Sequence, residues 1–320
     1  MIYYRERRYA MFMKERTAPH LLAALPRLMH RLPKSHECWE DIAQDHYKVR
    51  AGFGGEQYVD AILKRLRIPH VAVADLQLAE RFCQIDTVVL TPAFALILEV
   101  KNFSGTLLFN ETSFHMEQET RDGTRLGFNS PATQVWNAKE ELALIVDRLG
   151  VKLPIHTAIV LPYSSTLVER APKDIPLVYG NALNHFISRL PQTGRLMPFS
   201  EMEAIGQLLI NHHSPFLKTD YSKTYFYETK DLKKGVLCGS CGSPCRRMSQ
   251  RTFICNSCQA KVVDGYERAL DDWFEFATPG ISGEQLQAYL GLKDKHAVGY
   301  LMRKMGFVRI EGSRVYQRVE

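Results

Sequence analysis

The feature that most constrains how this chain can fold is a cluster of cysteines in its C-terminal third. Cys238 and Cys241 form one Cys-x2-Cys pair, and Cys255 and Cys258 form a second pair a hairpin's length further on. Each pair can deliver two thiolates to one tetrahedral Zn2+, and four thiolates leave no open position for catalysis. The spacing therefore predicts a structural four-cysteine zinc ribbon over residues 236–262, with a β-hairpin between the two pairs.

The other cysteines leave an alternative open. Cys245 could replace Cys238 or Cys241 as a ligand, although it follows Pro244 and the symmetric pairing favours the other four. A redox-active pair would need a strand-to-helix context, which neither Cys-x2-Cys pair has. Free buried cysteines would not explain the paired spacing. Five of the seven cysteines are clustered, which is typical of metal binding rather than of the disulfides of a secreted protein.

No segment has the features of a membrane anchor or a secretory signal. The longest apolar stretch, residues 87–100, is interrupted by Thr91-Pro92 and is shorter than a bilayer requires. The first residues are basic but have no apolar run behind them. We therefore expect a cytoplasmic protein without membrane contact. The length of 320 residues indicates two or three domains, and the net charge of +6 indicates nucleic acid only where positive residues cluster.

The middle of the chain has the pattern of a compact α/β domain. A helix follows Gly52, Gly54 and Gly55 and ends near residue 66, and a later helix begins at Ser130-Pro131, where the serine is placed as an N-cap. Runs of strand-forming residues predict strands at residues 70–78, 84–91, 94–101, 113–120 and 155–161.

Three acidic residues and a lysine stand at the ends of these elements. Strand alternation places Glu99 and Lys101 on one face, and Asp86, which shares a face with Val88, would lie beside Glu99 if the two strands pair. Glu56 lies in line with the apolar stripe of the first helix. Converging carboxylates suit Mg2+ or Mn2+, and a nearby lysine can stabilise charge on a phosphate. The alternative is an exposed Glu99–Lys101 pair at a strand edge, with Asp86 in a turn.

Several short motifs follow one another in this region. They are Gly52-Phe53-Gly54-Gly55-Glu56, Gln84-Ile85-Asp86, Leu98-Glu99-Val100-Lys101-Asn102, Gly105, and Asn129-Ser130-Pro131 with Gln134. As an ordered set, over residues 48–162, they resemble the nuclease-related (NERD) domain, which is assigned to the PD-(D/E)xK nuclease superfamily. One departure is the residue inserted between Asn129 and Pro131, which affects the placement of Asn129 but not the acidic residues.

The resemblance implies a fold and a set of roles. The fold would be a restriction-endonuclease-like core with a mixed central sheet. By resemblance, Asp86 and Glu99 would be metal ligands and Lys101 the catalytic lysine. Glu56 would be the helix-borne acid, and Gln134 would be an additional polar group of the active site.

The segments that flank this domain carry fewer signals. Residues 1–47 have leucines at helical spacing and are interpreted as a helical N-terminal extension. Residues 163–235 contain no recognisable motif and are interpreted as a helical extension or linker, with helices near 182–190 and 200–212.

The last segment, residues 263–320, has the order of a winged helix. Helices are predicted at residues 266–276, from a Ser282–Gln285 capping box to Leu290, and after Asp294, and a hairpin follows at residues 307–310 and 315–319. From residue 293 onward there are seven lysines and arginines against three acids. This predicts a DNA-binding tail, with a protein-binding module as the alternative.

Two groups of residues are expected to contact nucleic acid. On the third helix of the tail they are His296, Tyr300, Arg303 and Lys304. On the ribbon hairpin they are Arg246, Arg247 and Arg251, and the alternative for these three is that they are merely solvated.

Together these patterns predict a nuclease dependent on Mg2+ or Mn2+ that cleaves phosphodiester bonds in DNA, in processing, repair or defence. A structural Zn2+ ribbon and the winged-helix-like tail would direct it to DNA. One alternative is a non-catalytic DNA-binding or regulatory protein that keeps the nuclease fold as a scaffold. Another is an RNA-processing factor.

Overall fold

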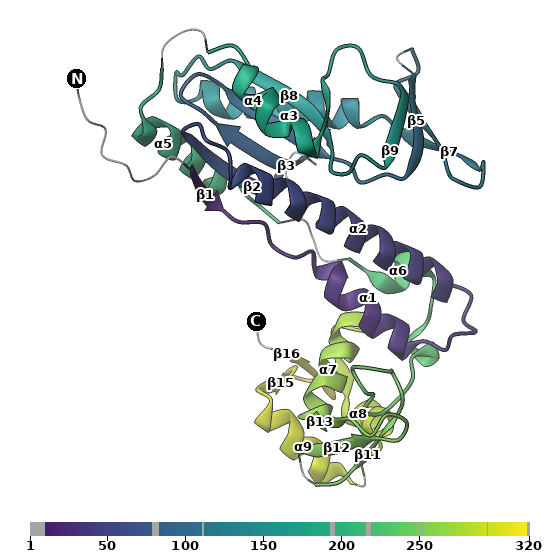
Figure 1. Ribbon diagram of the computed structural model, residues 1–320. Helices are drawn as coiled ribbons and strands as arrows, with labels where there is room; N and C mark the ends of the chain where they lie inside the picture. The colour runs from purple at the N-terminus through teal and green to yellow at the C-terminus, as the bar shows by residue number, and fades with distance from the viewer. Residues whose placement is uncertain are drawn as a thin grey trace. The chain divides into compact units, whose positions relative to one another are not determined.

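The computed structural model describes residues 10–78, 83–110, 112–192, 196–215, 219–249, 251–292 and 294–318. The chain forms two compact units (Figure 1). One contains the described residues of Met1–Ala18 and Arg50–Leu217, and the other contains those of Pro19–Val49 and Lys218–Glu320. Among the described residues, no helix is both long enough and apolar enough to cross a bilayer.

The first unit is built on a six-stranded mixed sheet. In spatial order its strands are β1 (Ala10–Lys14), β2 (His70–Leu78), β3 (Cys83–Leu90), β4 (Ala95–Val100), β8 (Ile155–Leu161) and β10 (Leu177–Tyr179). β3 runs antiparallel to β2 and β4, and the other neighbours are parallel. Five strands therefore end at the edge of the sheet where β3 begins.

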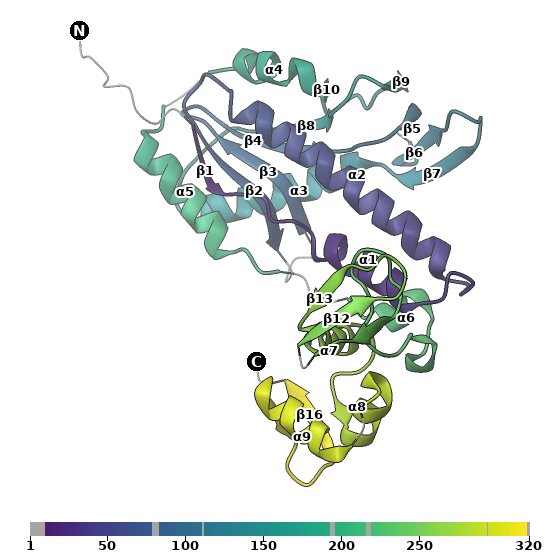
Figure 2. The ribbon, with the colours of Figure 1, turned by 60° about the horizontal axis from the view of Figure 1, so that its bottom comes forward.

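Helices cover both faces of this sheet (Figure 2). On one face, α2 (Trp39–Leu63) and α4 (Leu183–Arg189) bury apolar side chains against β3, β4 and β8. On the other face, α3 (Pro131–Asp147) and α5 (Phe199–Asn211) pack on β2, β3 and β4. The result is a three-layer α/β unit with a separate core on each face of the sheet.

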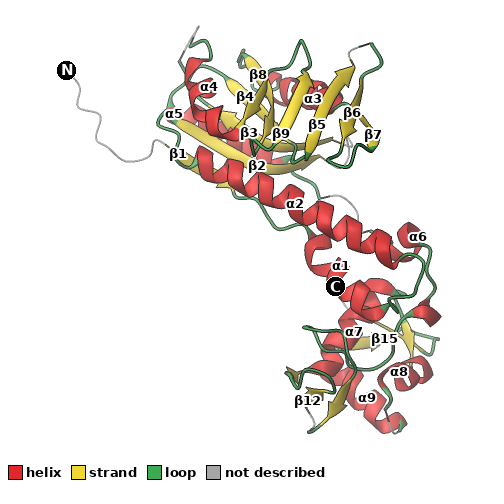
Figure 3. Cartoon of the chain, turned by 45° about the vertical axis from the view of Figure 1, so that its right-hand side comes forward, coloured by secondary structure: helices red, strands yellow, loops and turns green. Residues whose placement is uncertain are grey.

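A second, four-stranded sheet belongs to the same unit (Figure 3). In spatial order its strands are β7 (Arg125–Asn129), β6 (His115–Glu119), β5 (Gly105–Asn110) and β9 (Thr166–Arg170). Its buried face packs against α3 and the end of β8. The sequence predicts only β6 of these strands. β7 is exposed at all five of its residues, so no alternation of apolar and polar residues marks it.

The second unit combines the first helix of the chain with its C-terminal part. α1 (His20–Arg31) shares a buried core with α6 (Tyr221–Tyr225) and with Phe276. Arg31 is almost completely buried, donates to Asp272 Oδ2 at 2.7 Å, and also donates to two main-chain oxygens. The four-cysteine region forms an antiparallel sheet of β11 (Cys245–Arg247), β12 (Thr252–Cys255) and β13 (Lys261–Val263).

The tail follows the order helix, strand, helix, helix and hairpin. Its elements are α7 (Gly265–Phe276), β14 (Ile281–Ser282), α8 (Gly283–Leu290), α9 (Lys295–Lys304), β15 (Phe307–Arg309) and β16 (Val315–Arg318). The predicted caps are present: Ser282 and Gln285 form a capping box, Gly291 ends α8 with a φ of 65°, and the Asp294 side chain accepts from Ala297 N. Val319, the last residue of the predicted hairpin, lies outside the described residues.

Three predictions of secondary structure are wrong. Residues 10–14 form β1 rather than a helix, because they complete the sheet beside β2, and residues 1–9 lie outside the described residues. Gly52, Gly54 and Gly55 do not precede a helix but lie inside α2, which runs on to Leu63. Residues 163–235 contain the expected helices as α4 and α5, but they also supply β9 and β10 to the two sheets, so this segment is not a helical linker. Two 3-10 helices, Gly180–Ala182 and Thr229–Asp231, complete it.

Candidate functional site

Asp86 lies where the hydrogen-bond ladder between β3 and β4 stops. The two strands pair as far as Thr87 opposite Leu98. Beyond that point the buried Asp86 accepts a hydrogen bond at Oδ2 from Val100 N at 2.8 Å. A carboxylate thus takes the place of a strand carbonyl as the acceptor. This contact holds Asp86 beside the segment of β4 that carries Glu99, as the sequence predicts.

The strict alternation expected around Asp86 does not hold. Asp75, which the register of β2 and β3 places opposite Asp86, has a left-handed φ of 52°. In both strands the side chains change faces at this position. Ile85 and Val88 are three residues apart, yet both are buried in the core next to α3 and α5. The irregularity frees Asp86 from the apolar core face that simple alternation would assign to it.

Glu99 and Lys101 form a close pair at the end of β4. The Lys101 ammonium lies 2.7 Å from Glu99 Oε1, and the Glu99 side chain is only 4% exposed. The main-chain N of Lys101 donates to Val160 O at 2.9 Å, which ties the end of β4 to β8. Lys101 keeps a quarter of its side chain exposed, so the pair is buried on one side and open to solvent at the lysine. It is not the fully solvated edge pair of the alternative interpretation.

The site carries more negative charge than its lysine compensates. Burial, and next the carboxylate of Asp86, raise the pKa of Glu99 to about 8. Burial likewise raises the pKa of Asp86. For Lys101 burial alone would lower the pKa, but Glu99 and Asp86 outweigh it and raise the pKa. Two desolvated carboxylates repel each other, and the single positive charge of Lys101 does not neutralise both. A divalent cation bound between them would remove the remaining repulsion.

Arg16 is the main residue of this region that sequence reasoning missed. Its side chain is 3% exposed and lies 2.9 Å from both Glu56 Oε2 and Asp60 Oδ2. It also donates to Asp86 O at 2.8 Å and to Thr87 Oγ1 at 2.9 Å. One guanidinium therefore joins α2 to β3 directly behind the Asp86 carboxylate. The partners are far apart in sequence, so no local pattern could have indicated them.

Glu56 is held by this arginine rather than presented freely to a metal. Arg16 lowers the pKa of Glu56, but burial first and Asp86 second act more strongly and raise it to about 7. Among the described residues, Glu56, Asp86 and Glu99 do not bring three ligand oxygens within 4.8 Å of one another. The three carboxylates therefore do not form one compact set of metal ligands, and the ion pair of Glu56 is with Arg16.

Asp75 is a second residue that the sequence analysis did not single out. It is buried, receives hydrogen bonds from Thr17 Oγ1 at 2.9 Å and Gln77 Nε2 at 3.0 Å, and lies 3.5 Å from Lys14 Nζ. A lone acid inside the otherwise apolar run of β2 was the signal that could have found it. Its charge adds to the negative field at Asp86 and Glu56.

Gln134 and Asn129 belong to α3 and β7. Gln134 is exposed on α3, next to the buried Val135, and no described hydrogen bond links it to the acidic residues. Asn129 ends β7, where it pairs with His115. The Ser130 side chain caps α3 by accepting from Ala132 N, as predicted.

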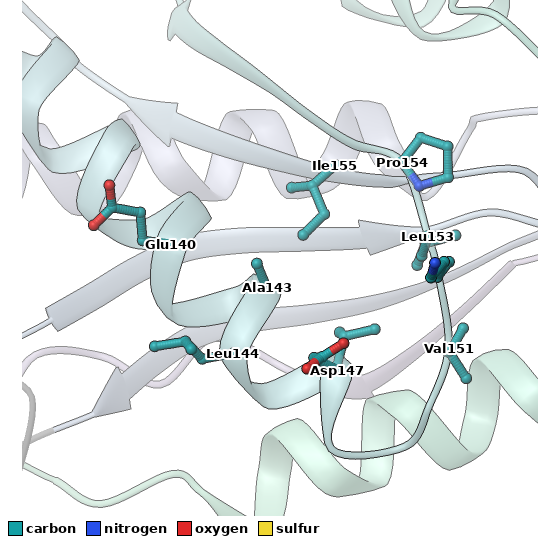
Figure 4. A pocket seen from close by; sticks show the side chains of 10 residues that line it. Glu140, Ala143, Leu144, Asp147, Val151, Leu153, Pro154 and Ile155 are labelled. Atoms are coloured by element: carbon teal, nitrogen blue, oxygen red, sulfur yellow. The ribbon is translucent and has the colours of Figure 1, made fainter.

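A groove in the first unit lies at the opposite end of the sheet from Lys101. It has a volume of about 820 Å³ and is formed between the end of α3 and the start of β8, with Leu144, Val151 and Ile155 in its wall and Glu140 and Asp147 among its polar groups (Figure 4). Ile155 pairs with Ala95 at the beginning of β4, whereas Glu99 and Lys101 lie beyond the middle and end of that strand. The groove is therefore separate from the acid–lysine cluster.

In the second unit the four predicted cysteines converge. Their sulfurs all lie within 4.8 Å of one another. The individual separations are 3.7 Å for Cys238–Cys258, 3.5 Å for Cys241–Cys255 and 3.6 Å for Cys241–Cys258. A tetrahedron with metal–sulfur bonds of about 2.3 Å has edges of about 3.8 Å, so this set fits one Zn2+. Cys245 is outside the set, in agreement with the prediction.

Some of the basic residues that are expected to contact nucleic acid already contact another side chain of the protein. On the ribbon, Arg251 pairs with Asp264 at 2.8 Å and Arg247 lies over the Tyr266 ring, while Arg246 is exposed. On α9, Lys304 pairs with Glu267 at 3.1 Å. Within residues 296–304 of α9, the exposed residues are His296, Tyr300, Arg303 and Lys304, and they lie opposite the buried Val298, Leu301 and Met302, as the apolar stripe predicts.

The mixed sheet, its helical layers and the acid–lysine cluster at one sheet edge define a nuclease-like α/β unit. Comparison with protein families makes this specific: residues 51–162 match the family model of the nuclease-related domain (NERD). The match includes Glu56, Asp86, Glu99, Lys101 and Gln134. No curated protein and no solved structure gives a significant match to the chain.

Proposed function

We propose that the nuclease-related domain hydrolyses phosphodiester bonds in DNA with the help of Mg2+ or Mn2+. In this proposal Asp86 and Glu99 hold the metal ion, and Lys101 binds the scissile phosphate or orients the attacking water. When bound, the ion would lower the pKa of a water molecule and neutralise charge on the phosphate. The observation that carries the proposal is the convergence of Asp86, Glu99 and Lys101 at one edge of the sheet in the matched domain.

The donor set fits such an ion. Both carboxylates are buried and offer oxygen ligands, and burial raises the pKa of each because the positive charge of Lys101 does not offset it. Arg16 and Glu56 act behind them in this proposal: the arginine fixes the backbone of Asp86, and Glu56 fixes the arginine. Gln134, on the exposed side of α3, would contact substrate rather than metal.

The purified full-length chain tests the proposal directly. We expect it to cleave labelled DNA when Mg2+ or Mn2+ is added and to leave the same DNA intact without added metal. A panel of single-stranded, duplex, nicked and branched DNA, with matching RNA as competitor, would identify the substrate. Absence of metal-dependent cleavage on the whole panel would contradict the proposal.

A non-catalytic scaffold is the second function that the structure supports. Lys101 already contacts Glu99, and Glu56 is occupied by Arg16, so the acidic residues are partly satisfied without a metal. Under this interpretation the chain binds DNA and cuts neither strand. The cleavage panel separates the two functions, because binding without cleavage is the scaffold's expected result. Preferential competition by RNA would instead favour an RNA-processing factor.

We further propose that the zinc ribbon and the winged-helix-like tail supply DNA affinity through α9 and the β11–β12 hairpin. Deleting residues 236–320 would not test this cleanly, because the buried side of α1 packs against Phe276 and would be exposed. Charge reversal of an exposed residue is a better test. Arg303 lies outside the buried stripe of α9 and Arg246 outside the ribbon core, so neither substitution should disturb folding.

The double substitution Arg303→Glu and Arg246→Glu is expected to weaken DNA binding and to flatten its salt dependence. Each lost phosphate contact should reduce the slope of log affinity against log salt by about 1, because fewer counterions are released. The control is Lys152→Glu, which also reverses an exposed charge but lies in the first unit, in the groove far from Lys101. An unchanged slope in the double variant would make the tail a protein-binding module instead.

A further inference from the structure

Four aromatic residues lie around the segment that carries Lys101. Phe103 and Phe128 form one pair with ring centroids 5.7 Å apart, and Tyr58 and Tyr163 form a second pair at 5.2 Å. Tyr58 is 40% exposed, Tyr163 41% and Phe128 36%. We refer to Tyr58, Phe103, Phe128 and Tyr163 as the aromatic rim.

The fold brings the tyrosine pair next to the end of β4. Tyr163 closely follows the end of β8, which runs parallel to β4. Tyr58 lies on α2 one turn beyond Gly55. A Cβ atom on that glycine would lie 2.9 Å from Pro162 and 3.1 Å from Asn102, so α2 packs directly on the loops that leave β4 and β8.

The phenylalanine pair connects the same segment to the second sheet, which lies beyond the ends of β4 and β8 (Figure 2). Phe103 is two residues after Lys101, and its carbonyl accepts from Thr166 Oγ1 at 2.6 Å. Phe128 comes from β7, whose five residues are all exposed. The register places Phe128 and Leu126 on the same face of the second sheet as the buried Met116. Both belong to the edge strand β7, which stays exposed.

The chemistry of the aromatic rim fits nucleotide bases rather than the phosphates of a duplex. Ring faces bind bases by stacking, and each stacked base contributes about 10-fold or more in affinity. A duplex hides the faces of its bases and is bound through cations on its phosphates. The cation of β7, Arg125, is paired with Glu119 and Glu117 at 3.2 Å and 3.7 Å, so it is not presented freely to phosphate.

We propose that the aromatic rim binds unpaired bases on both sides of the Lys101 segment, so that the strand to be cut enters single-stranded or locally unwound. This inference rests on the proposed nuclease function and adds the substrate class to it. A strand bound in this way would lay its sugar–phosphate backbone across Lys101 while bases on either side stack on the two aromatic pairs.

Binding without added Mg2+ or Mn2+ tests the aromatic rim apart from cleavage. The probe is a fluorescent oligothymidylate, with a hairpin duplex of the same number of phosphates for comparison. We expect Phe128→Ala and Tyr163→Ala each to weaken oligothymidylate binding about 10-fold, and to leave duplex binding unchanged. The control is Leu167→Ala, which removes an apolar side chain 61% exposed on the opposite face of the second sheet.

Photocrosslinking gives a second measurement. It identifies the residues in contact with the oligonucleotide, so binding by the tail cannot hide a contact with the aromatic rim. When thymidines are replaced by 5-iododeoxyuridine, adducts mapped by mass spectrometry should fall on aromatic rim residues. Adducts confined to residues 236–320, or unchanged affinity in both variants, would overturn the proposal and leave the aromatic rim as a surface for a protein segment or a second copy. Specific binding and crosslinking without any cleavage would instead support the rim and contradict the nuclease function.

Discussion

Replacing Lys101 with alanine is expected to slow metal-dependent DNA cleavage by about 100- to 1,000-fold, the usual effect of removing one group that stabilises charge in a transition state. The fold should survive, because the Lys101 side chain is partly exposed and Glu99 can take up a proton when its partner is lost. DNA binding should change little, since one cation among many phosphate contacts is removed. Single-turnover cleavage and equilibrium binding of the same DNA would measure the two effects separately.

Two further variants make this prediction specific. Glu99→Gln keeps the size of the side chain and removes a proposed metal ligand, so we expect it to lose at least as much activity as Lys101→Ala. Lys152→Ala removes an exposed lysine from the groove at the other end of the sheet and should cleave like the unmodified protein. If Lys101→Ala cleaves DNA at the unmodified rate, the chemistry is located elsewhere and the proposed site is wrong.

The residues of the acid–lysine cluster could be predicted because each belongs to a short motif at the end of an apolar run. The pairing of the two strands predicts that Asp86 lies beside the segment with Glu99, and the hydrogen bond from Val100 N places it there. Alternation could not predict that the side chains of both strands change faces beside Asp75. That irregularity involves the left-handed backbone of Asp75, whose main-chain oxygen and carboxylate both contact Lys14 on β1, a strand in a segment that was predicted to be helical.

Arg16 shows a different limit of sequence reasoning. The Arg16 guanidinium contacts the site through Glu56, Asp60 and the backbone of Asp86, all of them at least 40 residues away in the chain. Hydrophobic periodicity reports which side of an element is buried, but it does not report which distant charge will meet it. A buried ion network of this kind becomes visible only when the strands and helices have been placed.

The second unit shows where local signals suffice and where they fail. Caps and turn residues predicted α8, α9 and the hairpin correctly, because Ser282, Gly291 and Asp294 act within a few residues of their own backbone. The partner of α1 could not be predicted in this way. Its apolar side indicates only that something covers it, and the structure shows that residues more than 190 positions later do so.

Replacing Cys255 with serine is expected to abolish zinc binding and unfold the ribbon. Cys255 is completely buried, and its sulfur is one of the four that converge. Among the described residues, the ribbon's own apolar core consists of Val236, Phe253 and Val262, which is far smaller than an independently folding domain needs. Zinc binding, worth about 10–16 kcal/mol in comparable sites, would supply most of the missing stability.

Zinc content and limited proteolysis measure this effect. The unmodified chain should hold one zinc per molecule and resist cleavage by protease within residues 236–262, whereas Cys255→Ser should hold almost none and be cut there. Cys245→Ser is the matched control, since its sulfur lies outside the group of four, and it should keep both its zinc and its resistance. Loss of zinc in Cys245→Ser would show that the ligand set is not the symmetric one. A full zinc complement in Cys255→Ser would show that zinc binding does not depend on the Cys255 thiolate. The double variant Cys245→Ser, Cys255→Ser would then show whether Cys245, which pairs with Cys255 across β11 and β12, had replaced it.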